Sequence, residues 1–265
     1  MAGFDAFAPF RMTGHAVVMT GGARNIDAGI ATTLTGAGAR VMIADLNGDK
    51  AAETARAISS ETGGECRGMT YDVTDDQAVA KLVAATAEAS GGISTPGNNV
   101  GWGGRQPDPT AIPDAEFLRA FELNRISAYR MSMACLPWLE KAQNATITNS
   151  GSFSAALPAY DILPYATAKA ALDQMMVSLA HLLNRKVRVN SVLVGTIVTP
   201  GYADAGIDPA VQERLAHPDI LVGRASRPEA IANAMLWLCS PASGWVSGQI
   251  INVHGGGSVV RLFGS

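Results

Sequence analysis

The sequence predicts a single α/β domain of the Rossmann type, a doubly wound parallel sheet of about seven strands with helices on both faces. Short apolar segments rich in β-branched residues alternate with longer helical segments along the whole chain. The glycines are spread over short turns, and no linker, repeat or change in composition divides the chain. We therefore expect one domain over residues 1–265.

In the first half of the chain, each expected strand runs into a helix. Residues 16–19 are apolar and reach Thr20-Gly21-Gly22, as a strand entering a turn does. Thr74 and Gln77 have the spacing of a capping box, so a further helix should begin there. The other elements expected in this half are a helix at 26–37, a strand at 41–44 and a helix at 49–61.

The second half continues the alternation. Residues 114–140 form a long helical stretch, and Pro137 should bend or end it. The remaining expected elements are strands at 146–148, 187–192 and 250–253 and helices at 165–183 and 228–238.

Composition excludes several classes of protein. Apolar residues make up 48% of the chain and charged residues 16%, which excludes disorder driven by charge. A net charge of −3 argues against nucleic acid or an anionic membrane as partner. No apolar run is long enough to span a membrane and no signal-peptide pattern begins the chain, so we expect a cytoplasmic protein. Because its cysteines and histidines are scattered, we expect reduced, buried thiols at Cys66, Cys135 and Cys239 and no metal site.

The turn at 20–27 and the acid Asp45 together predict a dinucleotide site. A glycine-rich turn that opens a helix lets backbone N–H groups and the helix dipole meet a pyrophosphate, although an ordinary strand-to-helix turn also favours glycine. Asp45 ends the next strand, where a carboxylate accepts hydrogen bonds from both ribose hydroxyls of an adenosine. By itself, Asp45 could equally be an ordinary helix-capping acid. The glycine-rich turn followed by Asp45 favours NAD as the cofactor, because the carboxylate would repel the 2′-phosphate of NADP.

Tyr165 and Lys169 form the most specific pattern in the chain. Residues at i and i+4 share one face of a helix, so the ammonium would stabilise the phenolate and let the tyrosine exchange a proton with an alcohol. Ser152 ends the strand just upstream and could hydrogen-bond a substrate oxygen there. Alternatively, Tyr165 and Lys169 could be an exposed helix pair without function, and Ser152 an ordinary turn serine. The combination of Ser152, Tyr165 and Lys169 instead favours hydride transfer between an alcohol and a nicotinamide.

Further motifs carry a resemblance to a known family. They are Asp72-Val73, Asn98-Asn99-Val100-Gly101, Asn124 after Glu122-Leu123, Arg188-Val189-Asn190 and residues 195–200. With them the sequence resembles the short-chain dehydrogenase/reductase superfamily over essentially its whole length. Residues 117–124, 231–241, 245–249 and 255–257 are similar to bacterial 7α-hydroxysteroid dehydrogenases within it. Because these are mostly framework residues, they indicate little about the substrate.

The resemblance implies roles for individual residues. Asn124 would support a water-mediated proton relay, Ser152 would position the substrate oxygen, Tyr165 would be the acid/base, and Lys169 would activate it. Asp72 and Val73 would contact adenine, and the nicotinamide carboxamide would meet Ile197 and Thr199. The full set of expected cofactor contacts is Gly21, Arg24, Asn25, Ile26, Asp45, Leu46, Asp72, Val73, Asn99, Gly101, Tyr165, Lys169, Ile197 and Thr199.

Several positions depart from the family pattern. Asn25 and Asp27 stand where the turn usually has glycine. Asn25 should keep the turn, since asparagine tolerates positive φ, whereas a carboxylate at Asp27 about 5 Å from a pyrophosphate costs roughly 3 kcal/mol. Pro96-Gly97 occupies the central fourth strand, where proline removes a backbone donor.

We therefore expect an NAD-dependent short-chain alcohol dehydrogenase/ketone reductase. Its substrate would be a secondary alcohol or ketone, such as a hydroxysteroid or another alicyclic or aromatic alcohol. Substrate loops are expected at 102–105 and 153–160, with an apolar flap at about 199–220. The resemblance implies a homotetramer, with the tail at 258–263 packed in an interface. A 3-oxoacyl- or quinone-type carbonyl reductase and a non-catalytic nucleotide-binding oligomer are the alternatives.

Overall fold

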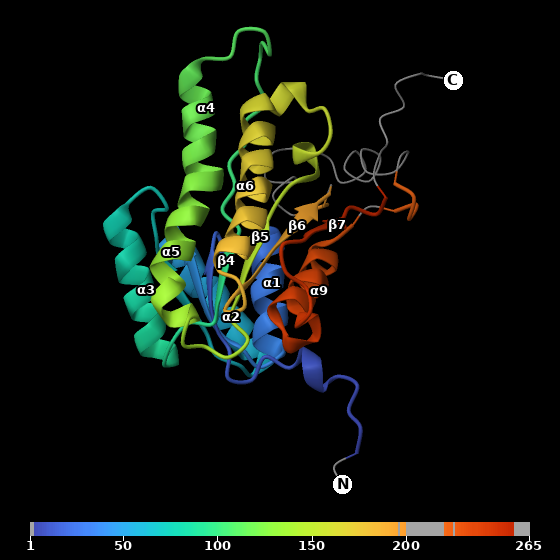
Figure 1. Cartoon of the computed structure of the whole chain (residues 1–265). Coiled ribbons are helices and arrows are strands. Elements are labelled where there is room, and N and C mark those ends of the chain that lie inside the picture. The colour runs from blue at the N-terminus through green and yellow to red at the C-terminus, as the bar shows by residue number, and fades with distance from the viewer. Residues whose placement is uncertain (1–2, 196, 200–219, 225, 257–265) are drawn as a thin grey trace.

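The computed structural model, which describes residues 3–195, 197–199, 220–224 and 226–256, confirms the predicted fold class. Within these residues, seven parallel strands form one sheet in the order β3-β2-β1-β4-β5-β6-β7. Helices cover both of its faces (Figure 1). The strand order reverses between β1 and β4, which is where sheets of this kind bind ligands, beyond the carboxyl ends of the strands.

The strands are short, and β1, β4 and β5 are buried along their whole length because helices cover both sides. Their bounds are β1 (Ala16–Thr20), β2 (Arg40–Asp45), β3 (Cys66–Thr70), β4 (Thr95–Asn98), β5 (Thr146–Ser150), β6 (Arg188–Val194) and β7 (Ile250–Val253).

The edge strand β3 has no counterpart among the expected elements, because its sequence, Cys-Arg-Gly-Met-Thr, has no apolar run. It forms against α2 (Gly48–Thr62). A Cβ at Gly68 would lie 2.3 Å from the backbone carbonyl of Ala51, so the missing side chain lets the helix pack directly on the strand.

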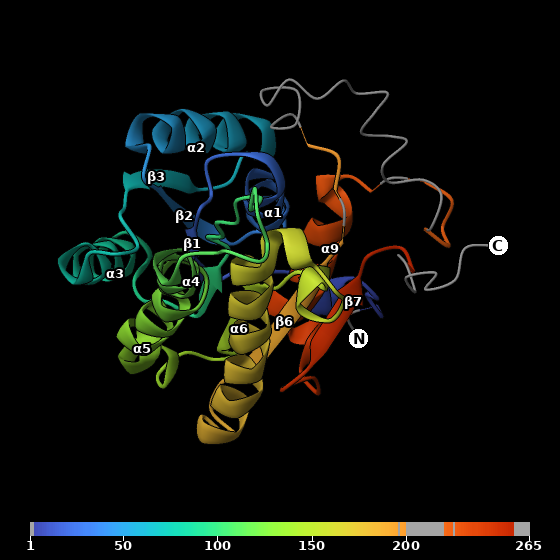
Figure 2. The same cartoon turned by 90° about the horizontal axis from the view of Figure 1, so that it is seen from above.

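The helices divide between the two faces (Figure 2). One face carries α1, α2 and α9 over a buried cluster that includes Ile30, Leu34 and Met235. The other carries α3, α5 and α6 over a second cluster that includes Leu82 and Met131. The remaining bounds are α1 (Asn25–Gly36), α3 (Asp76–Ser90), α4 (Asp114–Phe121), α5 (Ser127–Leu139), α6 (Leu163–Leu182) and α9 (Pro228–Cys239).

The expected capping box at the start of α3 is wrong by one residue. Asp75 is the N-cap, and its carboxylate accepts a hydrogen bond from Gln77 N at 2.8 Å. The Thr74 hydroxyl instead donates to Asp72 at 2.7 Å. The Asp75 carboxylate thus caps the first turn, while the Thr74 hydroxyl closes a turn upstream.

The long helical stretch expected at 114–140 contains a π-helical turn at Glu122–Ile126 between α4 and α5. Ser127 N donates to Glu122 O, five residues back, which adds one residue to that turn. Pro137 lies within the last part of α5, which ends two residues later. The π turn holds Asn124, one of the expected catalytic residues.

Pro96 and Gly97 do form the central strand β4, but with a short ladder on one side. β4 pairs with β1 from Thr95 to Asn98, whereas only Gly97 and Asn98 are in register with β5. The neighbouring β5–β6 ladder has five paired positions. The strand that contains the proline therefore forms the shortest ladder of the described sheet.

Cys66, Cys135 and Cys239 are buried and unpaired, as expected. Of the helices in the described ranges, none combines the length and apolar character needed to cross a lipid bilayer.

Candidate active site

A cavity of about 630 Å³ lies at the carboxyl ends of the central strands. Every residue expected to contact the cofactor lines it, from Gly21 and Asp45 to Ile197 and Thr199. Ser152, Tyr165 and Lys169 line it too. The structure thus brings residues from distant parts of the chain to one place, while their individual roles stay predictions.

The turn between β1 and α1 keeps the shape that backbone contact with a ligand requires. Gly21 has φ of +80°, and a Cβ there would lie 3.3 Å from Val100. Asn25, the first residue of α1, has φ of +52°, so it adopts the left-handed conformation expected of it. The replacement of glycine at this position therefore leaves the turn intact.

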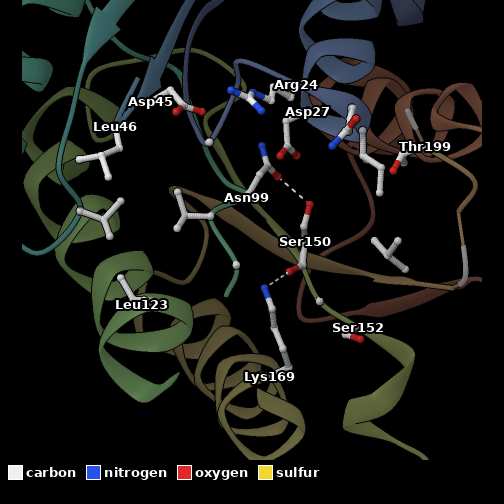
Figure 3. Close-up of a pocket in the computed structure, with 18 of the residues that line it drawn as sticks. Arg24, Asp27, Asp45, Leu46, Asn99, Leu123, Ser150, Ser152, Lys169 and Thr199 are labelled. Atoms are coloured by element: carbon white, nitrogen blue, oxygen red, sulfur yellow. Dashed lines mark hydrogen bonds between the residues drawn. The ribbon is translucent and has the colours of Figure 1, made fainter. Parts of the chain in front are cut away.

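Asp45 is held at the rim of the cavity by two backbone donors. Its carboxylate accepts hydrogen bonds from Asn47 N at 3.0 Å and from Ala23 N at 3.4 Å. These bonds connect the turns after β1 and β2 and fix the direction of the carboxylate. The exposed Arg24 lies beside it on the same rim (Figure 3).

Asp27 places a carboxyl group inside the cavity. It lies in the first turn of α1, and Figure 3 shows its side chain pointing into the cavity. Burial raises the pKa of Asp27 well above its usual range; the Lys169 ammonium opposes this effect and the Asp45 carboxylate adds to it. Because the positive end of a helix dipole attracts anions, Asp27 already occupies the position that would favour a bound phosphate.

Lys169 and Tyr165 share one face of α6, as their spacing predicts. Lys169 is only 2% exposed, and its ammonium donates to Ser150 O at 2.7 Å. Its Nζ lies 5.7 Å from the centre of the Tyr165 ring. Burial lowers the pKa of Lys169 to about 8, against the opposing effects of Asp27 and Asp173. The two side chains are therefore close enough for the role expected of Lys169, which stays a prediction.

Ser152 combines a structural position with a place in the cavity wall. It caps the short helix Phe153–Ala155, and its hydroxyl oxygen accepts from Ser154 N at 3.3 Å. The two serine hydroxyl oxygens are 2.8 Å apart. Ser152 therefore has the structural position of a capping serine and also lies where a serine could hydrogen-bond a substrate oxygen. Ser154, like Ser150, was not singled out from the sequence; its two-residue spacing from Ser152 is the only signal.

Asn124 does not line the cavity. Its Oδ1 accepts from Trp102 N at 3.1 Å, and its Nδ2 donates to Trp102 O and Ala120 O, both at 2.8 Å. A Cβ at Gly101 would lie 3.3 Å from both Asn124 Oδ1 and Lys169 Nζ, so Asn124 and Lys169 lie on either side of the same glycine. Its expected part in a proton relay stays a prediction.

The loop at 101–106 lies against Tyr165. A Cβ at Gly103 would be 2.5 Å from the tyrosine ring, so the bare backbone packs there. Arg119 stacks 4.1 Å from the centre of the Trp102 ring. Arg105 pairs with Asp161 at 3.2 Å, which ties this loop to the end of the other expected substrate loop. The flap at about 199–220 and the tail at 258–263 lie almost wholly outside the described residues.

No group of three or more His, Cys, Asp and Glu side chains in the described ranges could hold a metal ion.

The fold and cavity define an α/β protein with a dinucleotide-type site, and comparison with known proteins identifies its family. A family model described as enoyl-(acyl carrier protein) reductase matches residues 21–258. A 7α-hydroxysteroid dehydrogenase of Escherichia coli K12 is 35% identical over 93% of this chain and 95% of its own. This chain belongs to the short-chain dehydrogenase/reductase family of oxidoreductases.

Two further relatives have similar coverage. A 2,5-dichloro-2,5-cyclohexadiene-1,4-diol dehydrogenase of Sphingobium indicum is 30% identical over 94% of this chain and 98% of its own. The solved structure of a 7α-hydroxysteroid dehydrogenase with NADH and 7-oxo glycochenodeoxycholic acid has a TM-score of 0.88 and 34% identity. It covers 96% of this chain and 98% of that one. The resemblance stated from the sequence is confirmed.

The positive φ of Asn25 leads to a stability test. Asn25→Val should lose about 1–2 kcal/mol of unfolding free energy relative to Asn25→Gly, because a β-branched residue is strained at φ of +52°. Urea unfolding of both variants measures the difference. Equal stabilities would show that residue 25 does not adopt this conformation in solution.

Proposed function

We propose that this protein is an NAD-dependent dehydrogenase/ketone reductase that interconverts a secondary alcohol and a ketone. The observation that carries the proposal is the buried Lys169 beside Tyr165, with Ser152 in the same cavity wall. A hydroxysteroid or another alicyclic alcohol is the substrate class we favour. The names of the E. coli and Sphingobium relatives, which act on cyclic alcohols, support this choice.

The cavity fits a nicotinamide dinucleotide in most respects. Its volume is in the range of ligand sites, and it offers Asp45 for a ribose, Val73 and Val100 for an apolar ring, and the glycine turn for phosphates. Asp27 is the exception, since an ionised carboxylate would repel a pyrophosphate. The chemistry that the nicotinamide supplies when bound is the acceptance or donation of a hydride.

The chain's own residues account for the movement of the proton. Tyr165 takes the hydroxyl proton of the alcohol or returns it to the ketone oxygen. Lys169, held by Ser150 O, stabilises the phenolate form of Tyr165. Ser152 donates a hydrogen bond to the substrate oxygen and so fixes its distance from the tyrosine. The loop at 101–106, packed against Tyr165, limits the access of water.

A reductase acting on acyl-carrier thioesters is the second candidate, favoured by the description of the matching family model. Faster turnover of 3-oxoacyl or enoyl thioesters than of cyclic ketones would support it. A non-catalytic nucleotide-binding oligomer is less consistent with the site, because burying an ammonium beside a tyrosine costs free energy that a purely structural protein has no use for.

We infer that the enzyme is a homotetramer and that it works in the cytoplasm. Large apolar side chains lie exposed on α4, on α6 and after α9, at Leu118, Leu182 and Trp245. Burial of such side chains between subunits would stabilise an assembly.

Tyr165→Phe should reduce turnover of a cyclic alcohol at least about a hundredfold, because the variant lacks the acid/base group, and should leave NADH affinity nearly unchanged. A panel of steroid and alicyclic alcohols, assayed by NADH absorbance with binding followed by fluorescence, provides both readouts. Tyr129→Phe, a change at a half-exposed tyrosine outside the cavity, is the matched control. Undiminished turnover in Tyr165→Phe would disprove the mechanism.

Asp45 should make the protein prefer NADH to NADPH, since its carboxylate repels a 2′-phosphate. Parallel fluorescence titrations measure the two affinities. Asp45→Asn should reduce the ratio of the NADPH Kd to the NADH Kd about tenfold or more. Glu53→Gln, which removes a negative charge outside the cavity, should leave this ratio unchanged. A native preference for NADPH would contradict this role and point to Arg24 as the selecting residue.

NADH should bind more weakly as pH rises, because deprotonation of Asp27 puts a negative charge beside the pyrophosphate. Since burial raises the pKa of Asp27, the change should fall above the ordinary range of aspartate titration. Asp27→Asn should remove this pH dependence, and Asp27→Gly should tighten binding about tenfold to a hundredfold at high pH. Calorimetric titration from pH 5.5 to 8.5 tests both; tighter binding in the native protein at high pH would reverse the assignment.

A further inference from the structure

Asp173 is a buried acid that the mechanism above does not use. It lies on α6 one helical turn after Lys169 and is 5% exposed. Its Oδ1 accepts a hydrogen bond from the Ser191 hydroxyl, on β6, at 2.6 Å. A Cβ at Gly151 would lie 2.9 Å from the same oxygen. The carboxylate is thus enclosed between α6, the residue after β5 and the middle of β6.

Burial of a carboxylate is unfavourable unless a hydrogen bond and an opposite charge compensate it. The Ser191 bond is one compensation, and the Lys169 ammonium is the charged group that acts on Asp173 in the described part of the chain. Lys169, in turn, is acted on by two carboxylates, Asp27 from α1 and Asp173 from its own helix. The ammonium therefore has one acid on the cavity side and one on the protein side.

These two acids differ in what a ligand does to them. Asp27 faces the cavity, where a bound phosphate would favour its neutral form (Figure 3). Asp173 does not line the cavity and keeps its hydrogen bond to Ser191. It is therefore the counter-charge that persists when the cavity is filled.

We propose that Asp173 is a positioning residue, which keeps Lys169 charged and directed at Ser150 O beside Tyr165. The proposal rests on the proposed function, because it gives Lys169 the task of stabilising the Tyr165 phenolate. Ser191 extends this arrangement to β6 by holding the carboxylate. A hydrogen bond thus joins Ser191 on β6 to Asp173 on α6, and the charge of Asp173 acts on Lys169 beside Tyr165.

Spectrophotometric titration of the tyrosinate tests the proposal without cofactor or turnover. The difference between the native protein and Tyr165→Phe isolates the titration of Tyr165. Asp173→Asn keeps the size of the side chain and an acceptor for Ser191 but removes the charge. We expect it to move the Tyr165 midpoint to higher pH by about one unit, because fewer Lys169 side chains stay protonated.

One control variant and one second test variant complete the experiment. Gln174→Ala changes the exposed neighbour on the same helix and should leave the midpoint in place. Ser191→Ala keeps the charge but loses the hydrogen bond, so it should shift the midpoint in the same direction by a smaller amount. It also serves as the test if Asp173→Asn does not fold.

An unchanged Tyr165 midpoint in folded Asp173→Asn, or in Ser191→Ala if the first variant is unfolded, would overturn the proposal. In an active enzyme, the pH profile of kcat for alcohol oxidation should shift by the same amount, with KM little altered. If the midpoint shifts but no alcohol is oxidised, Asp173 acts as proposed and the proposed function fails.

Discussion

The hydrogen bond from the Lys169 ammonium to the Ser150 carbonyl joins the middle of α6 to the carboxyl end of β5. Around it, a Cβ at Gly101 would make a tight contact of 3.3 Å with the ammonium, and Tyr165 lies beside the charge. A second bond, from the Ser150 hydroxyl to Asn99 Oδ1 at 2.7 Å, extends the arrangement to the end of β4. Because the ammonium is buried, the free energy of removing it from water must be recovered through these contacts and through nearby carboxylates. Helix, strand ends and site chemistry are therefore fixed together.

The cost of burying charge also explains why the two acids that line the cavity near α1, Asp45 and Asp27, differ in their surroundings. Asp45 is stabilised by two backbone donors at the rim, whereas Asp27 lies inside the cavity at the positive end of α1. Without a ligand, the Lys169 charge and the positive end of α1 only partly offset the burial of Asp27, whose pKa is raised. Burial therefore opposes the ionised form of Asp27 in the empty site, and an anionic ligand would oppose it further. Folding and binding thus both favour the neutral form of this residue.

Much of this architecture could be predicted from the sequence, because apolar periodicity and turn residues determine which segments become strands and helices. The positive φ of Asn25 followed from the tolerance of asparagine for that conformation. The strand β3 did not follow, because it depends on the approach of α2 to Gly68 rather than on its own residues. The π turn around Asn124 was also hidden, since a one-residue insertion leaves the helical pattern almost unchanged. Contacts such as that of Asp173 with Ser191 join distant segments and need the fold.

The short ladder between β4 and β5 has a consequence for how the molecule opens. With only Gly97 and Asn98 in register with β5, the ladder with the fewest paired positions lies between β1 to β4 on one side and β5 to β7 on the other. Sub-global opening tends to follow boundaries where strand pairing is shortest. In amide hydrogen exchange, β4 should then behave as the border between two cooperative units, although it lies near the middle of the sheet. The cavity spans that border, so a ligand that contacts both sides would slow exchange on each of them.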